Sequence, residues 1–337
     1  MNLTKLEIDN LCDELSFSGV VMAKRENEMI IESAYGYANR ADELKNNLST
    51  RFGIASGCKL FTSISICQLV EKGLLTFETR LKDCLDIKFP QFDDEITIHH
   101  LLTHTSGVPD YFDEAIMDDF EELWIERPMY LMKNLENFLP LFQENKMMFK
   151  PGDHFHYNNA GYILLGLVIE KVSNTKFQDY VQTHIFDPCE MNDSGYFTFD
   201  NLPKNTATGY IDHEEDGTWR SNIYSLPVRG GSDGGAYITA PDMMKLWENL
   251  LNDKLFSKEM TTKLLTPYVL AEDDEYYGYG VWISKRANEI YKYHVMGYDP
   301  GVSFASSYYR NTRVTLVIPS NQSLGPHDIT HAMEENL

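Results

Sequence analysis

The sequence predicts an α/β protein of the α+β type, in which an antiparallel sheet is formed from both chain termini and is flanked by helices. Two observations support this fold class. Strand-like runs rich in β-branched and aromatic residues lie near both ends of the chain, and the segments between them have mainly helical patterns. One sheet then joins distant parts of the chain, and the middle forms an inserted, mainly helical lobe.

The chain of 337 residues is long enough for two domains, but no repeat and no low-complexity linker divides it. We therefore expect a single unit over residues 1–337. In this unit, residues about 1–75 and 235–337 form the α/β lobe, and residues about 76–234 form the helical lobe.

The first third of the chain begins with an amphipathic helix over Leu3–Leu15. Two strands, Ser18–Ala23 and Met29–Tyr35, follow around a polar turn and predict a hairpin. The next apolar run predicts a helix from Ser56 to about Gly73. Because apolar residues occupy nearly its whole circumference, this helix is expected to be buried.

Further elements follow the same two periodicities. Helical spacing of Met, Leu and aromatic residues predicts that Tyr111–Phe149 is mostly helical, and helices are also expected at Ile163–Val172 and Asp242–Leu251. The final third is rich in strands and ends in a short helix. These elements are Tyr279–Ser284, Ile290–Met296, Val302–Tyr308, Val314–Pro319 and the helix Asp328–Asn336.

Composition limits the partners and the compartment. The net charge of −22 argues against nucleic acid and anionic membranes, which bind basic patches, so we expect a small-molecule or peptide substrate and leave the oligomeric state open. No window is long enough to span a membrane, and the N-terminus lacks the pattern of a signal peptide. Five cysteines without metal-type spacing suggest reduced thiols and a cytoplasmic protein.

The start of the buried helix carries Ser56 and Lys59, one helical turn apart. A serine hydroxyl becomes a good nucleophile when a neighbouring base takes its proton, and a lysine can be that base if burial lowers its pKa. Taken alone, the pair is more typical of an N-cap serine followed by a lysine that reaches solvent. Its significance depends on the rest of the chain.

Two later segments supply matching groups. Tyr157 and Asn159 lie two residues apart in an expected extended turn, so their side chains point the same way. A tyrosine near an ammonium group can act as a general base, and an amide can orient the lysine or the substrate. His294 ends an expected strand and is followed by Gly297.

At this point the chain resembles the serine β-lactamase and penicillin-binding-protein superfamily, in its class C β-lactamase, DD-peptidase and esterase branch. The resemblance extends from Phe52 to Val302. It rests on three segments, which are Phe52–Thr62 around the serine, Leu101–Gly107, and 151–166 with its Tyr157-Asn158-Asn159. The Ser-x-x-Lys logic is shared by the whole superfamily.

The resemblance implies a role for each candidate residue. Ser56 resembles the acyl-accepting nucleophile, Lys59 its activating partner, and Tyr157 the general base and leaving-group acid. Asn159 resembles the positioning amide. His294 takes the place of the cation in the third motif, where it would tune Tyr157 and face a substrate carboxylate. The oxyanion hole would use the backbone N–H groups of Ser56 and Gly297.

The third motif departs from the family pattern. Met296 stands two residues after His294, where the family usually has glycine, and the glycine is delayed to Gly297. We expect Met296 and Tyr298 to line the substrate cleft. A bulky side chain there would narrow the cleft for large bicyclic lactams.

Other motifs are given no catalytic role. The pattern Gly-x-Ser-x-Gly around Ser232 is followed by an expected strand rather than by the helix that a nucleophile elbow needs. His154 and His156 have no third ligand at suitable spacing, so we expect neither a metal nor another cofactor. His104 is interpreted as a residue that fixes a loop.

The sequence therefore predicts a serine hydrolase that works through an acyl-enzyme on an ester, amide, small peptide or β-lactam. The alternative is a catalytically weak member of the same fold that binds a ligand or has a regulatory role. The departure at Met296 motivates this second hypothesis.

Overall fold

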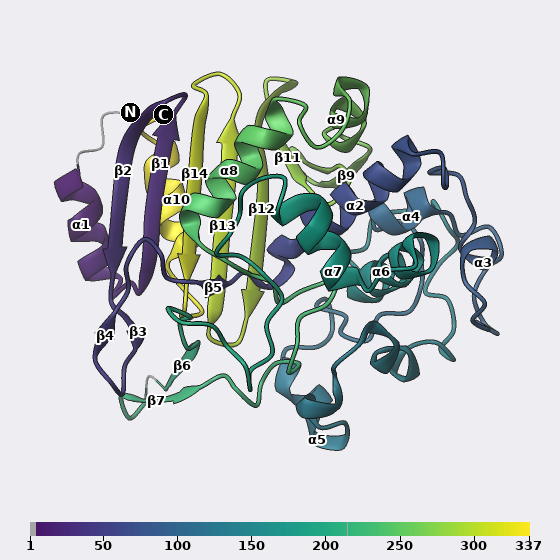
Figure 1. The fold of residues 1–337 in the computed structure, drawn as a ribbon, viewed down its shortest axis with the longest axis horizontal. Coiled ribbons are helices and arrows are strands. Elements are labelled where there is room, and N and C mark those ends of the chain that lie inside the picture. The colour runs from purple at the N-terminus through teal and green to yellow at the C-terminus, as the bar shows by residue number, and fades with distance from the viewer. Residues whose placement is uncertain (1–4, 214) are drawn as a thin grey trace.

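The computed structural model describes residues 5–213 and 215–337. Its centre is an eight-stranded antiparallel sheet in the order β2-β1-β14-β13-β12-β11-β10-β9 (Figure 1). The strands are β1 (Gly19–Arg25), β2 (Glu28–Tyr35), β9 (Val269–Glu272), β10 (Glu275–Tyr277), β11 (Trp282–Arg286), β12 (Glu289–Asp299), β13 (Val302–Tyr309) and β14 (Val314–Ser320). Pairing of β1 with β14 joins the two ends of the chain, which confirms the predicted fold class.

Helices cover both faces of the sheet. On one face lie α2 (Lys59–Glu71) and α8 (Ala240–Leu251), where the indole N–H of Trp247 donates to Ser306 Oγ at 2.8 Å. On the other face lie α1 (Lys5–Glu14) and α10 (Pro326–Glu334), whose apolar side chains share a core cluster with β1 and β14. In Figure 1, α8 passes in front of the sheet and α10 lies behind it.

The helix α6 (Asn159–Ser173) packs against α2. The other helices are α3 (Leu81–Cys84), α4 (Ile98–Leu102), α5 (Leu123–Glu126), α7 (Phe177–Val181) and α9 (Lys258–Leu264). Short strand pairs are formed by β3 (Tyr37–Asn39) with β4 (Leu44–Lys45), β5 (Phe52–Gly53) with β8 (Tyr237–Ile238), and β6 (Tyr210–His213) with β7 (Thr218–Ser221).

The prediction of a mostly helical segment at Tyr111–Phe149 is wrong. The segment contains α5 and several single 3₁₀ turns, joined by extended residues. Pro128 and Pro140 lack the amide hydrogen that a continuing helix needs. The apolar spacing reflects aromatic packing instead, since the ring of Phe138 contacts those of Tyr111 and Trp124.

Three smaller differences concern boundaries. The first residues of the expected N-terminal helix, at Leu3, lie outside the described part of the chain. The strand expected from Tyr279 begins only at Trp282, because Gly280 has a left-handed φ of 70° and turns the chain. The predictions also missed β9 and β10, which are too short for a clear periodicity.

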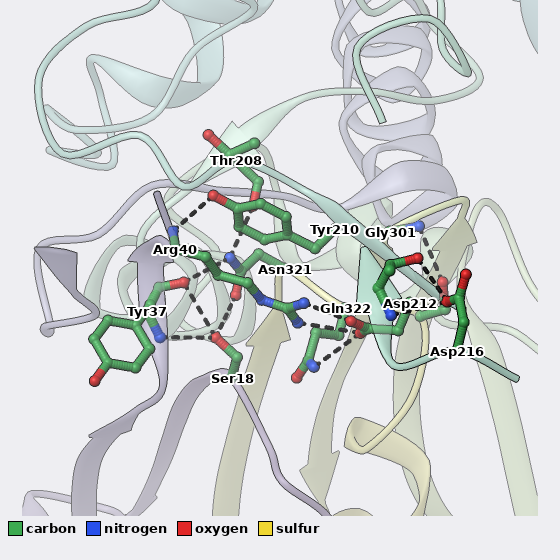
Figure 2. A network of polar contacts seen from close by, with 12 residues as sticks. Ser18, Tyr37, Arg40, Thr208, Tyr210, Asp212, Asp216, Gly301, Asn321 and Gln322 are labelled. Carbon is green, nitrogen blue, oxygen red and sulfur yellow. Dashed lines mark hydrogen bonds and ion pairs between the residues drawn. The ribbon is translucent and has the colours of Figure 1, made fainter. Parts of the chain in front are cut away.

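A polar network lies at one end of the sheet (Figure 2). The side chain of Asn321 donates to the carbonyl oxygens of Tyr37 at 3.0 Å and Thr208 at 2.8 Å, and accepts from Ser18 Oγ at 2.8 Å. Beside it, Gly301 approaches Tyr210 so closely that an added Cβ would lie 2.8 Å from the Tyr210 backbone nitrogen. The network thereby anchors the turn between β12 and β13.

Replacing Asn321 by alanine should therefore destabilise the fold. The substitution removes the side-chain donor to the Thr208 carbonyl oxygen, leaves the Tyr37 carbonyl oxygen with only the Ser18 hydroxyl at 3.3 Å, and removes one acceptor from that hydroxyl. We expect this loss to lower the free energy of unfolding by about 2 kcal/mol. Denaturant unfolding measures this change. The exposed Asn201 provides the control, since Asn201→Ala should change stability by less than about 0.5 kcal/mol. Equal effects of the two substitutions would contradict the anchoring role.

Candidate active site

Ser56 lies in a 3₁₀ turn, Ala55–Cys58, that leads directly into α2. Ala55 has a φ of 43°, a left-handed conformation that is uncommon for a residue with a side chain and is often found at functional turns. The turn presses against β13, because a Cβ added to Gly57 would lie 2.6 Å from the ring of Phe304. The serine is thus held at the end of the buried helix, against the sheet.

Lys59 is buried below Ser56, with 1% of its surface exposed. Its Nζ donates to three oxygens, which are Ser56 Oγ at 2.9 Å, Asn159 Oδ1 at 2.8 Å and the carbonyl oxygen of Asp233 at 2.7 Å. These three acceptors use all three hydrogens of an ammonium group. The structure therefore brings Ser56, Lys59 and Asn159 together.

Asn159 is positioned by the start of α6. Asn158 caps this helix, since its Oδ1 accepts the N–H of Gly161 at 2.7 Å. The carboxylate of Asp110 accepts the N–H groups of Asn159 at 2.7 Å and Ala160 at 2.9 Å. With its backbone fixed in this way, Asn159 can direct its amide oxygen at Lys59.

Tyr157 joins the same cluster from the other side. Its ring centroid lies 4.9 Å from Lys59 Nζ. The ring packs on His104, with centroids 4.4 Å apart, and stacks on Trp282 at 6.1 Å. His104 also accepts the N–H of Asn158 through Nδ1 at 3.0 Å, so this loop histidine supports both the tyrosine and the start of α6.

The charges of the cluster differ from the sequence-based expectation. Burial alone would lower the pKa of Lys59, but the nearby Tyr157 and Asp233 outweigh burial and raise this pKa above its ordinary value. This direction favours the ammonium form of Lys59, which matches its three hydrogen-bond acceptors. Burial raises the pKa of Tyr157, and Lys59 partly opposes that shift.

Gly297 brings β12 against the nucleophile. A Cβ at this position would lie 2.1 Å from the Ile54 carbonyl oxygen and 2.8 Å from the Ser56 backbone nitrogen. β11 pairs with β12 only as far as Trp282 and His294, so residues 295–299 are hydrogen-bonded to β13 on one side and leave the other edge open within the described chain. Within the described residues, an unpaired backbone edge of β12 therefore lies beside Ser56.

The structure places His294 away from this cluster. Side chains alternate along a strand, so His294 and Gly297 face opposite sides of β12, and Val295 takes the position two residues before the glycine. His294 Nε2 lies 3.0 Å from a carboxylate oxygen of Glu275. Burial lowers the pKa of His294, although Glu275 opposes the shift. The reason for the difference is register, because the glycine that meets Ser56 is three residues after His294 rather than two.

The same alternation places Met296 and Tyr298 on the face opposite Gly297, where they are 46% and 64% exposed. Both line a large cavity of about 1170 Å³ that also includes Ser56, Tyr157 and Asn159. Gly297 rather than Met296 therefore makes the close approach to the Ser56 backbone, while Met296 lines the cavity.

Sequence reasoning missed the residues that support the cluster. Asp233 supplies a carbonyl oxygen to Lys59, and its carboxylate accepts a hydrogen bond from Tyr111. Asp110 holds α6, and Glu114 accepts from the amide of Asn159 at 3.3 Å. The glycine-rich run around Asp233 was a visible signal of a tight turn, but a backbone acceptor has no signature in residue identity.

The remaining motifs have structural surroundings. Ser232 is fully buried against α6, where a Cβ on Gly166 would lie 2.2 Å from its hydroxyl, and the strand β8 follows it. His156 Nε2 lies 3.0 Å from Asp113, and His154 Nδ1 lies 3.1 Å from Asp153. Each of these side chains has a local packing or pairing role.

Comparison with known proteins agrees with this fold. The chain belongs to the Beta-lactamase family, whose model matches residues 8–334. A penicillin-binding protein from Bacillus halodurans has a crystal structure that is 55% identical, with a TM-score of 0.95 and coverage of 98% of this chain and 100% of that one.

Two curated relatives are more distant. Penicillin-binding protein 4* of Bacillus subtilis (strain 168) is 28% identical over 331 residues, which cover 93% of this chain and 70% of the relative. The teichoic acid D-alanine hydrolase of Staphylococcus aureus (strain MRSA252) is 25% identical over 286 residues, 84% of this chain and 67% of the relative. The predicted family is confirmed, and the chain is a serine hydrolase of the β-lactamase-like class.

Within the described residues, no helix is both long and apolar enough to cross a membrane.

Adding a methyl group at Gly297 should disrupt the site. The Cβ of Gly297→Ala would force β12 away from the Ser56 backbone, and loss of one oxyanion donor typically lowers kcat by about 10²–10³-fold. Steady-state hydrolysis of a p-nitrophenyl ester measures the effect. Gly53→Ala is the matched control, because its Cβ would make only ordinary contacts of 3.5 Å or more. Similar activity in both variants would show that the close approach at Gly297 is unimportant.

The charges of the cluster predict a pH profile. The sequence-based prediction makes Tyr157 the base, which must lose its proton to act. Burial raises the pKa of Tyr157 above its ordinary value, so under this prediction the reactive form becomes more abundant as pH rises. We expect kcat/KM for a neutral ester to rise about tenfold per pH unit between pH 6 and 9. His294→Asn should keep this profile, since the histidine lies on the other face of β12. A kcat/KM that does not change with pH, or a pH profile that His294→Asn alters, would contradict the prediction that Tyr157 is the base.

Proposed function

We propose that Ser56 is the acyl-accepting nucleophile of this hydrolase, acting on an ester, amide, small peptide or β-lactam. The observation that carries the proposal is the pair of hydrogen bonds from Lys59 Nζ, to Ser56 Oγ at 2.9 Å and to Asn159 Oδ1 at 2.8 Å, beside the cavity. They hold a hydroxyl, a cation and an amide together at the place where a substrate can enter. The relatives named as a penicillin-binding protein and a D-alanine hydrolase support this range of substrates.

In the first step, Ser56 Oγ attacks the acyl carbon while its proton passes to the phenolate form of Tyr157. Lys59 remains an ammonium ion, and its charge stabilises that phenolate. The negative oxygen that develops on the substrate accepts hydrogen bonds from the backbone N–H groups of Ser56 and Gly297. Asn159 keeps Lys59 aligned.

In the second step, the bond to the leaving group breaks and Tyr157 returns its proton to that group, which leaves an ester on Ser56. A water molecule then attacks this ester and gives a proton to Tyr157. The acid product leaves as Ser56 recovers its hydroxyl hydrogen, so the cycle is balanced without a cofactor.

The observation that suggested the alternative, a catalytically weak binding protein, no longer supports it. The alternative rested on Met296 standing beside the nucleophile, and the close approach of Gly297 to the Ser56 backbone weighs against that position for Met296. Turnover separates the two possibilities. Ligand binding near Ser56, without hydrolysis of p-nitrophenyl esters or nitrocefin, would favour the binding protein.

We also propose that the protein works in a reducing compartment, the cytoplasm. All five of its cysteines are free thiols, and four of them are buried. Burial raises the pKa of the Cys58 thiol to about 12, so this cysteine beside the nucleophile is not itself reactive.

Covalent labelling tests the nucleophile directly. A fluorescent fluorophosphonate should label the wild-type protein, and intact mass followed by peptide mapping should place the adduct on Ser56. Ser56→Ala should lose all labelling and turnover. Ser232→Ala is the control, because this serine is buried against Gly166 and should have no part in the reaction. Unchanged labelling of Ser56→Ala would end the proposal.

A further inference from the structure

The face of β12 that looks toward the nucleophile carries no positive charge. Val295, Gly297 and Asp299 alternate on this face, and Gly297 fixes its direction by its contact with Ser56. Val295 is 3% exposed and packs in the apolar core. A substrate carboxylate at this strand would therefore find an isopropyl group where the family pattern places a cation.

Asp299 is the next residue on that face. It lies two residues beyond Gly297, about 7 Å along an extended strand from the proposed oxyanion position. Its carboxylate lines the cavity and is only partly buried. No side-chain hydrogen bond or ion pair to Asp299 is present among the described residues, whereas Asp233 accepts from Tyr111 and Glu114 accepts from Asn159. Asp299 is thus free to bind a ligand.

The surroundings of Asp299 favour a cation. Burial raises the pKa of Asp299 to about 8, and the negative charges of Asp233 and Glu114 add to the shift. The cavity is lined by eight carboxylate residues, Glu114, Asp118, Asp119, Glu121, Asp233, Glu275, Asp299 and Asp328. Lys292 is the one lysine or arginine among its lining residues, and its Nζ is bound to Glu334 at 2.7 Å.

We propose that the substrate carries an ammonium group on its acyl part. Asp299 binds this group while Ser56 attacks the acyl carbon, so the proposal rests on the proposed function of Ser56. Asp299 is then a specificity-determining residue. The cation relieves the repulsion among the carboxylates around Asp299, whereas an anionic acyl group would increase it. Aminoacyl esters and amides with a free amine have the required chemistry.

Three p-nitrophenyl esters test the charge preference. The acyl group is 4-(trimethylammonio)butanoyl in the cationic ester, 5,5-dimethylhexanoyl in its neutral isostere and adipoyl in the anionic ester. Each measured rate is corrected for spontaneous hydrolysis of the ester. We expect kcat/KM to be at least about tenfold higher for the cation than for the neutral isostere, and lower again for the anion. Asp299→Asn should reduce the ratio of cation to neutral isostere about tenfold.

A surface variant controls for net charge. Asp273→Asn removes one negative charge at an exposed turn whose left-handed φ of 42° suits asparagine, and it should keep the wild-type ratio. A wild-type ratio of one or less would overturn the proposal. The proposal would also be overturned if Asp299→Asn left the ratio of cation to neutral isostere unchanged, or if Asp273→Asn lowered this ratio as much as Asp299→Asn does.

A binding measurement separates this proposal from the failure of the catalytic one. If no ester is hydrolysed faster by the wild type than by Ser56→Ala, the proposed function fails. Calorimetry with Ser56→Ala then still compares 4-(trimethylammonio)butanamide with neutral 5,5-dimethylhexanamide. Tighter binding of the cationic amide, lost in the double variant with Asp299→Asn, supports the cation site, and equal binding of both amides overturns it.

Discussion

The site depends on one buried ammonium group. Lys59 Nζ binds oxygens from three separate parts of the chain, which are the turn before α2, the start of α6 and the glycine-rich turn at Asp233. A buried charge is stable only when its hydrogens are all paired, so the three segments are constrained to meet at this point. The nucleophile is positioned as a consequence of satisfying the lysine.

This constraint also bears on the proposed acid–base chemistry. Because Tyr157 and Asp233 raise the pKa of Lys59 despite its burial, the proposed mechanism uses the lysine to stabilise negative charge and leaves the proton transfers to Tyr157. Two aromatic side chains hold the Tyr157 ring in place, since it packs on His104 and stacks on Trp282. The cavity beyond the cluster is lined by eight carboxylate residues, on which the proposed preference for a cationic substrate rests.

Much of the fold was predictable from periodicity. The hairpin β1–β2, the helices α2, α6 and α8, and the strands β12 to β14 all carry clear patterns of burial, and the structure has them near the expected bounds. The segment 111–149 was not predictable, because its aromatic spacing fits a helix while its prolines and its core contacts produce separate turns. The sheet could be expected to use both termini, but its eight-strand order depends on long-range pairing.

The site was predictable where residue type and spacing carry the chemistry. The Ser-x-x-Lys spacing and the Tyr157-Asn158-Asn159 segment pointed to residues that the structure brings together. His294 shows the limit of this reasoning. The direction of a strand side chain changes with every residue, so a shift of one position placed the histidine on the wrong face. The acceptor role of the Asp233 carbonyl and the cavity position of Asp299 depend on backbone geometry alone.

The most direct test of the central role of Lys59 is the rate at which a fluorophosphonate reacts with Ser56 in Lys59→Met. Methionine is nearly as long as lysine but offers neither charge nor hydrogens, so the hydroxyl, the phenol and the amide lose their common partner. The second-order rate constant at pH 7.5 should fall by about 10³-fold or more while the protein remains folded by circular dichroism. A folded variant that reacts within about tenfold of the wild-type rate would contradict the account.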